Sequence, residues 1–542
     1  MSVAKSSLLM AGGTIVSRIL GFARIVVLAL TIGVTTDAAD AFGVANQLPN
    51  NVYAIIAGGV LSAVLVPQIV KAKSHKDGGL GYIDRLLTLA IVVFAVITVI
   101  ATISAPLLIS IYTTGWSPAQ LALATAFAYW CIPQIFFYGI YAMLGEVLNA
   151  RSTFGPYMWA PVLNNLVGIL GLVAFLVIFG ADPTGVRAVE VWGSEQIALL
   201  GGSATLGVMA QALILFFSWR KIGINFSLNF SWRGVGLRPA MKAAVWTIGM
   251  VLVSQIGGLI STLVASRAVA DRSEGVAIAS IAAMLIAWLI FMLPHSVVTV
   301  SIATAYFTKM SEHVQAKRVD LMKADLRSAL RIVVLVNVFS AIALILLSLP
   351  VSRVFVGEYP STVALGNVLF ATMFGLIPFG FVFMFQRAFY ALEDTRTPFV
   401  FTAIQIVFHI AGSVVLFFTM ASEFLVMSLA GLTSATILIQ ALAAYLFLRA
   451  RVGRIGAPPK GEALSLRVLV ASLVTALVGY GLIVALGGTS ESSLALGSIV
   501  GAVAVIFATG LVMLLAYVLV LKLLRVPEID TALKGIGGIL RR

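Results

Sequence analysis

The stretch of sequence that decides the fold is SLLMAGGTIVSRILGFARIVVLALTIG, which occupies residues 7–33. It is longer than the about 20 residues that an apolar helix needs to cross a bilayer. Two arginines, Arg18 and Arg24, lie well inside this apolar run. A guanidinium at the centre of a bilayer costs at least about 2.5–3.5 kcal/mol, so it normally faces a wet cavity or a partner. The stretch therefore predicts a membrane-spanning helix that lines a polar cavity.

The spacing of the polar residues indicates which face of this helix lines the cavity. Ser17, Gly21 and Arg24 are four and three residues apart, so they share one face. Arg18 lies about 120° from Arg24 around the helix. Both guanidiniums reach one cavity only if it is wide or if the helix deforms at Gly21. The alternative is that both arginines extend to the lipid headgroups, which suits a charge near a helix end.

The composition of the whole chain is that of a polytopic membrane protein. Of 542 residues, 61% are hydrophobic and only 10% are charged, against about 25% charged in soluble domains. The predicted fold class is therefore all-α, with about fourteen transmembrane helices. The predicted spans are residues 7–33, 42–70, 86–112, 121–148, 157–180, 197–219, 240–265, 276–307, 329–355, 363–392, 399–420, 424–448, 468–486 and 494–524.

The distribution of basic residues predicts the orientation of these spans. Lysines and arginines gather in every second loop, for example at Lys309, Lys317 and Arg327. The positive-inside rule then places both termini in the cytoplasm. A net charge of +14 in this arrangement indicates contact with anionic lipids at the cytoplasmic loops, not with nucleic acid. The single cysteine, Cys131, excludes an intrachain disulfide.

A weak internal repeat suggests two lobes. Residues 132–161 and 377–401 each have Ile-Pro early in a helix, an aromatic-rich middle, a short turn and a proline that opens the next helix. The repeat predicts an N-lobe at residues 1–222, a C-lobe at 223–455 and a C-terminal helix pair with a tail at 456–542. Lobes of this kind hold substrate near the midplane and rock to alternate access. Chance recurrence of proline in membrane helices is the alternative.

The second span carries features of a hinge. Pro49 removes a helix hydrogen bond, and Asn50 and Asn51 can bind the freed carbonyls or face water. Gly58 and Gly59 allow a bend or a close approach. We expect Pro49, Gly58 and Gly59 at a gate and the two asparagines in the cavity. Packing through small residues is the alternative.

Other polar residues near or inside the spans are few. Asp40 is a gate candidate that could pair with an arginine or be a solvated loop acid. His295, Arg387 and His409 are candidates for the cavity of the second lobe. For Arg387 the alternative is extension to the headgroups, and for the histidines it is helix packing.

Signatures of soluble catalysis are absent from the sequence. It contains no Walker loop, HExxH, CxxC or GxSxG motif, and the predicted outward loops are too short to hold an active site. We therefore expect no enzyme, no cofactor and no metal site. A membrane glycosyltransferase would need carboxylates in its loops, and a scaffold would not explain buried arginines.

Residues 17–24, SRILGFAR, resemble the SRxLGFxR signature of the MurJ/MviN lipid II flippases, which belong to the multidrug/oligosaccharidyl-lipid/polysaccharide exporter superfamily. The resemblance extends along the chain through Asp40-Ala41-Phe42, Leu48-Pro49-Asn50, Leu148-Asn149-Ala150, Leu293-Pro294 and Asp394-Thr395-Arg396-Thr397-Pro398. Fourteen spans match the family's number. A sibling exporter of other polyprenyl-diphosphate glycans or of drugs is the alternative, and such siblings usually have about twelve spans by the family pattern.

The resemblance implies a function for the chain. It implies a flippase of the bacterial inner membrane that moves undecaprenyl-pyrophosphate-linked peptidoglycan precursor, lipid II, from the inner to the outer leaflet. It also implies a central cationic cavity, a tail groove at the last two helices, and cell-wall synthesis proteins as possible partners. A diphosphate suits paired guanidiniums, because arginine binds phosphate oxygens in bidentate fashion.

Two departures from the family pattern affect the expected site. Family arginines after Leu-Pro-Asn and before the eighth-span proline are replaced here by Tyr53 and by the stretch Trp288-Leu289-Ile290. Phosphate binding therefore depends more on Arg18 and Arg24. Span seven has no carboxylate, so the sodium site of some members is not expected.

Overall fold

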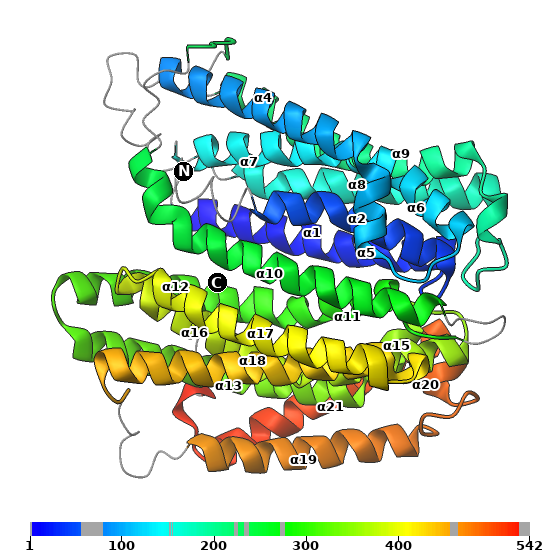
Figure 1. Ribbon diagram of the computed structural model, residues 1–542. Coiled ribbons are helices and arrows are strands. Elements are labelled where there is room, and N and C mark those ends of the chain that lie inside the picture. Colours follow the sequence, from blue (N-terminus) through cyan, green and yellow to red (C-terminus); the bar gives the residue numbers. More distant parts are fainter. Residues whose placement is uncertain are drawn as a thin grey trace. The chain divides into compact units, whose positions relative to one another are not determined.

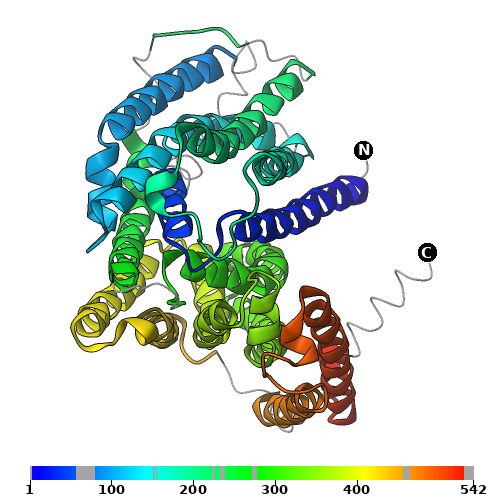
Figure 2. The same ribbon diagram turned by 90° about the vertical axis from the view of Figure 1, so that its right-hand side faces the viewer.

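The computed structural model describes residues 3–55, 80–150, 153, 155–221, 226–231, 238–270, 277–455 and 464–529. All regular structure in these ranges is helical, and the chain divides into two compact units, Met1–Asp271 and Arg272–Arg542. Within each unit, long helices run side by side (Figure 1), and the view turned by 90° looks nearly along many of them (Figure 2).

The first unit contains nine α-helices and one short 3₁₀ turn among its described residues. They are α1 (Val3–Ile32), α2 (Asp37–Ile55), α4 (Leu80–Ile103), α5 (Ala105–Tyr112), α6 (Pro118–Cys131), α7 (Gln134–Ala150), α8 (Gly155–Phe179), η2 (Val189–Val191), α9 (Ser194–Lys221) and α10 (Arg238–Ala270). Its core lies between α4, α7 and α9 around Leu87, Phe94, Leu144 and Trp219.

The second unit is also helical throughout its described residues. It contains α11 (Ile281–Pro294), the π-helical turn η3 (His295–Thr299), α12 (Val300–Gln315), α13 (Val319–Leu346), α14 (Ser348–Arg353), α15 (Tyr359–Met373), α16 (Leu376–Ala391), α17 (Arg396–Thr419), α18 (Ser422–Val452), α19 (Leu464–Ala485), α20 (Leu494–Gly497) and α21 (Ile499–Leu523). Its core gathers Met384, Phe389, Phe401 and Ala444.

The helices confirm a polytopic membrane protein. Twelve helical spans in the described residues are long and apolar enough to cross a membrane, and the bent pair α15–α16 makes a thirteenth. The one remaining predicted span, residues 42–70, coincides with α2 in its first part and then enters residues 56–79, which lie outside the description. Apolar side chains also face outward, with Val177 80% and Phe418 77% exposed, as expected where hydrocarbon replaces water.

The Ile-Pro positions of the predicted repeat lie at or just after breaks in helices of both units. In the first unit, Ile132 and Pro133 separate α6 from α7. In the second, α15 and α16 meet at an angle of 42°, shortly before Pro378. Proline lacks the N–H that continues a helix, which explains the break at Pro133. Among the described residues, each unit thus has a broken span at or within a few residues of the Ile-Pro pair.

Helix α10 packs against helices of the first unit. The loop between α5 and α6 holds its C-terminal part. Thr114 N donates to Ser266 Oγ at 2.8 Å, and Trp116 Nε1 donates to Ser266 O at 3.2 Å. Helix α10 also contacts α2 and α5.

Candidate functional site

The two predicted arginines project from one uninterrupted helix. Helix α1 runs from Val3 to Ile32 and passes Gly21 without a break. At 1.5 Å and about 100° per residue, Arg18 and Arg24 are about 9 Å apart along the axis and about 120° apart around it. The two guanidiniums therefore leave α1 in different directions, and a shared ligand must be large enough to reach both.

Arg24 is held in place by a chain of side-chain amides. Its Nη1 donates to Asn164 Oδ1 of α8 at 3.3 Å, and Asn164 Nδ2 donates to Gln211 Oε1 of α9 at 2.7 Å. Arginine has five N–H donors, and this is the one hydrogen bond of its guanidinium to the described residues. The amides thus orient Arg24 and leave donors for a ligand.

The bare backbone of Gly168 makes room for Arg24. A Cβ at Gly168 would lie 2.6 Å from Arg24 Nε and 2.8 Å from Arg24 Cζ, which is inside van der Waals contact. The guanidinium therefore lies directly against α8. Any side chain at position 168 would displace Arg24 from this place.

Ser17 and Gly21 lie in the contact between α1 and α8. Asn165 Nδ2 donates to Ser17 O at 2.8 Å and lies 3.4 Å from Ser17 Oγ. The same amide covers Gly21, where a Cβ would be 3.5 Å from Asn165 Nδ2. These two residues fix α1 on α8, which sets the position of both arginines.

Arg18 has an unsatisfied donor. Its Nε is buried and has no hydrogen-bond partner among the described residues. A buried polar group without a partner costs about 1–3 kcal/mol, and more when it is charged. A bound oxyanion would remove that cost, so Arg18 is suited to a negatively charged ligand.

The predicted hinge in α2 forms hydrogen bonds with α5 and α10. Pro49 lies inside α2. Asn51 Nδ2 donates to Tyr112 Oη of α5 at 3.1 Å, and Gln255 Nε2 of α10 donates to Asn51 O at 2.9 Å. Asn50 is exposed, with its amide 3.4 Å from Asn46 O. The structure thus places Asn50 at the surface of the unit and Asn51 between three helices.

Of the three remaining gate candidates, the structure describes Asp40 but not Gly58 or Gly59. Asp40 is completely buried in the first turn of α2, so its alternative interpretation as a solvated loop acid is wrong. Its backbone N–H donates to Thr36 O at 3.1 Å and so joins the helix start. Gly58 and Gly59 lie outside the described residues.

In the second unit, two of the three predicted residues share an aromatic row. The Arg387 guanidinium lies 4.8 Å from the Phe383 ring centroid, 5.8 Å from that of Phe307 and 5.9 Å from that of Tyr390. The centroid of the His295 ring lies 5.1 Å from that of the same Phe383 ring. Such cation–π contacts stabilise a partly desolvated guanidinium by about 0.5–2 kcal/mol. His409 is buried separately on α17.

Aromatic side chains occupy the positions where the sequence departs from the family's arginines. The Tyr53 ring lies 5.1 Å from that of Tyr138. Trp288, next to Leu289, stacks on Phe291 at 5.0 Å. Both places are therefore occupied by aromatic contacts within their own units.

Four residues of this site were not predicted from the sequence: Asn164, Asn165 and Gly168 of α8 and Gln211 of α9. A signal for the three amides exists, because amides inside apolar spans are costly unless they find partners. Which partner they find depends on how α1, α8 and α9 pack. Among the described residues, no group of three or more His, Cys, Asp or Glu side chains could hold a metal ion.

Comparisons with known proteins identify the family. The family model "Lipid II flippase MurJ" matches residues 28–504, a range that begins after Arg24. A probable lipid II flippase MurJ from Rhizobium tropici is 27% identical over 432 residues, which are 78% of this chain and 77% of that protein. One from Rhizobium meliloti (strain 1021) is 24% identical over 432 residues, with the same coverage.

Solved structures share the fold. A lipid II flippase MurJ in an inward closed conformation superposes with a TM-score of 0.70 at 20% identity, covering 93% of this chain and 98% of that chain. An inward-facing multidrug-resistance MATE transporter of the MOP superfamily gives 0.60 at 16% identity, covering 81% and 100%. Since the family match spans most of the chain and the family consists of transporters, the prediction that the chain is not an enzyme is confirmed. The chain belongs to the lipid II flippase MurJ family of multi-pass membrane proteins.

Proposed function

We propose that the chain carries lipid II from the inner to the outer leaflet by alternating access, and that Arg18 and Arg24 bind its diphosphate. The observation that carries the proposal is the orientation of the Arg24 guanidinium by Asn164. This contact uses one of the five N–H donors of the guanidinium and leaves others for the ligand. The Nε of Arg18, which is buried and has no partner among the residues that the structure describes, supports it. Donors that are oriented before the ligand arrives bind an anion without a further ordering cost.

Ser17 and Gly21 act in this proposal as positioning residues, since their contacts with Asn165 fix α1 on α8. Asn50 and Asn51 border the path near the Pro49 hinge. In the second unit, Arg387 and His295 of the aromatic row line the cavity of the second lobe, and His409 lines it from α17. The lobes are proposed as residues 1–222 and 223–455, with the pair at 456–542 guiding the lipid tail.

The direct test is transport by the purified protein. Liposomes containing the chain and a fluorescent lipid II should show loss of the leaflet asymmetry of that lipid. Liposomes with the Arg24→Ala variant should retain it. A wild-type protein that leaves the asymmetry unchanged would contradict the proposed transport.

The proposed orientation places both termini and residues 309–327 in the cytoplasm, together with contacts to anionic lipids at the basic loops. A Ser311→Cys variant should therefore resist a membrane-impermeant maleimide in intact cells and react after permeabilisation. Ser492→Cys, an exposed position between α19 and α21, is the control that should react in intact cells. Native Cys131 is buried, which limits background labelling. Labelling of Ser311→Cys from outside would overturn the orientation.

We expect Pro49→Ala to slow transport without reducing the amount of folded protein. The substitution restores one helix hydrogen bond, about 0.5–1.5 kcal/mol, and so raises the cost of bending α2. That range corresponds to a rate about two- to tenfold lower. Pro106→Ala is the control, because Pro106 lies in the first turn of α5, where proline removes no helix hydrogen bond. Unchanged turnover of Pro49→Ala in liposomes would remove this hinge from the mechanism.

A further inference from the structure

The helical spans of the second unit are interrupted at the break between α15 and α16 and at the π-helical turn η3. Helices α15 and α16 meet at 42°. In η3, which lies between α11 and α12, Val300 N donates to His295 O, five residues back. Single π-turns inside α-helices are rare and frequently lie at functional sites. Because η3 packs against α13 and α16, the two interruptions are connected through neighbouring helices.

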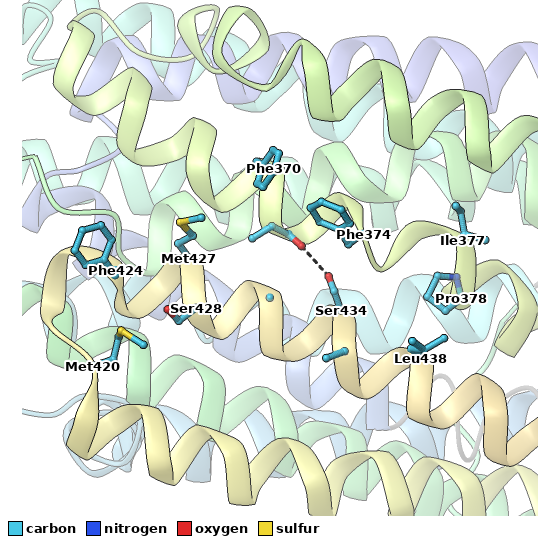
Figure 3. A pocket seen from close by; sticks show the side chains of 13 residues that line it. Phe370, Phe374, Ile377, Pro378, Met420, Phe424, Met427, Ser428, Ser434 and Leu438 are labelled. Carbon is cyan, nitrogen blue, oxygen red and sulfur yellow. Dashed lines mark hydrogen bonds between the residues drawn. The ribbon is translucent and has the colours of Figure 1, made fainter. Parts of the chain in front are cut away.

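The break between α15 and α16 receives a hydrogen bond from α18. Within the break, Gly375 N donates to Thr372 O at 3.1 Å, three residues back instead of the four of an α-helix. Ser434 Oγ of α18 donates to Ala371 O at 2.9 Å. Figure 3 shows Ser434 pointing toward the break, with Pro378 just beyond it. A side chain of a neighbouring helix thus binds a carbonyl at the place where the helix's own pattern is interrupted.

Asn337 of α13 links the break to the π-turn. Its Nδ2 donates to Leu376 O at 3.2 Å, and its Oδ1 accepts from Thr299 Oγ1 at 3.3 Å. Asn337 and Thr299 are both completely buried. Because a carbonyl oxygen only accepts hydrogen bonds, the amide nitrogen must be the atom that faces Leu376. One side chain thus binds the last residue of η3 and the first residue of α16.

The hydroxyl of Thr299 is used differently from that of Thr304 in the same span. Thr304 Oγ1 donates to Val300 O of its own helix at 2.8 Å, which is an ordinary place for a threonine hydroxyl inside a helix. Thr299 instead donates to Asn337 of α13. The hydroxyl of Thr299 therefore joins two helices, whereas that of Thr304 serves only its own.

Two further contacts hold η3 and the start of α16 together. A Cβ at Gly380 would lie 2.4 Å from Asn337 Nδ2, so the bare backbone of α16 lets the amide approach. One residue earlier, the ring centroid of Phe379 lies 4.5 Å from that of His295, the first residue of η3. Close-packed interiors are hardly compressible and transmit strain. A displacement of η3 therefore reaches α16 through Asn337 and through this ring pair.

We propose that Asn337 couples the π-turn η3 to the α15–α16 break, so that the two interruptions open and deform together. Sharp kinks of helices form at prolines and at π-turns, so these are the points at which the two spans bend most easily. Asn337 is then a positioning residue, which also fixes His295 of η3 against α16. The inference goes beyond the transport proposed above and does not depend on it.

Amide hydrogen exchange of the full chain in lipid nanodiscs, read by peptide mass spectrometry, tests this coupling. Thr299→Val removes the hydroxyl that binds Asn337 and nearly keeps the shape of the side chain. Loss of one hydrogen bond between membrane helices changes an equilibrium typically about threefold. Exchange reports such local opening. We therefore expect exchange about threefold faster both at residues 293–301, around the substitution, and at residues 371–380, on the other side of Asn337.

Thr304→Val is the matched control, because its hydroxyl donates within its own helix. Its loss should change exchange near residue 304 only and leave residues 371–380 as in the wild type. If Thr299→Val accelerates exchange at residues 293–301 alone, Asn337 does not couple the two interruptions and the inference is wrong. Equal acceleration at residues 371–380 by both variants would mean a general loosening of the unit and would contradict the inference as well.

The coupling must also act from α16 toward η3, because linkage between two equilibria is reciprocal. Gly380→Ala places a Cβ against Asn337 Nδ2 and should accelerate exchange at residues 293–301 about threefold. Gly431→Ala on α18, where a Cβ would meet no atom within 4 Å, should leave that exchange unchanged. Wild-type exchange at residues 293–301 in Gly380→Ala would overturn the inference. If Gly380→Ala does not fold, the comparison of Thr299→Val with Thr304→Val still decides.

Discussion

Arg24→Ala should abolish the ability of this protein to support growth of a flippase-depleted bacterial strain. The substitution removes the guanidinium that Asn164 orients on α8. Each charge-assisted hydrogen bond lost to a phosphate oxygen is worth about 1.5–3 kcal/mol, or about tenfold to a hundredfold in affinity. Folding should survive, because removal of a charge from a span relieves an insertion cost. Complementation at matched membrane levels is the measurement.

Two further variants at the same position separate binding from packing. Arg24→Lys keeps the charge but loses the planar fork, so it should restore growth only in part. Arg24→Gln keeps a donor for Asn164 without the charge and should not restore growth. If Arg24→Gln grows normally, Arg24 serves only the contact between α1 and α8. If Arg24→Ala itself grows normally, the diphosphate site lies elsewhere, and Arg387 with His409 would be tested next.

Gly168→Ala should impair transport nearly as strongly as loss of Arg24, although every charge of the site is retained. A Cβ there would lie 2.6 Å from Arg24 Nε, so the guanidinium must move. Because the displaced atoms are the end of a flexible side chain, helix α8 itself should fold normally. A catalytic or binding group misplaced by about 1 Å can lose about a hundredfold in rate. Flipping of fluorescent lipid II in liposomes is the measurement, with at least a tenfold loss expected.

Gly155→Ala is the matched control for this prediction. It lies at the start of the same helix, and a Cβ there would meet no atom within 4 Å. Transport by Gly155→Ala should equal that of the wild type. If Gly168→Ala flips lipid II at the wild-type rate, the position of Arg24 against α8 is unimportant for transport. The proposal that Arg24 is oriented before the ligand binds would then be wrong.

Much of the architecture could be predicted because hydropathy is a local property of the sequence. The apolar runs predicted the spans. Ile132-Pro133 lies at the break between α6 and α7, and Ile377-Pro378 follows the break between α15 and α16 by one residue. The arginines of residues 17–24 were conspicuous because a charge in an apolar run is costly wherever the helix faces. The prediction of helix faces was less complete, because periodicity places Ser17, Gly21 and Arg24 together without saying what they touch.

The sequence by itself determined that this chain is a polytopic helical membrane protein with two arginines inside its first span, since both follow from local composition. Only the tertiary structure decided the surroundings of those residues. It placed Asn164, Gln211 and Gly168 around Arg24, buried Asp40 completely, and put α10 with the first unit. The physical reason is that a side chain's partners come from helices far away in the sequence, and their contacts depend on packing that no single span encodes.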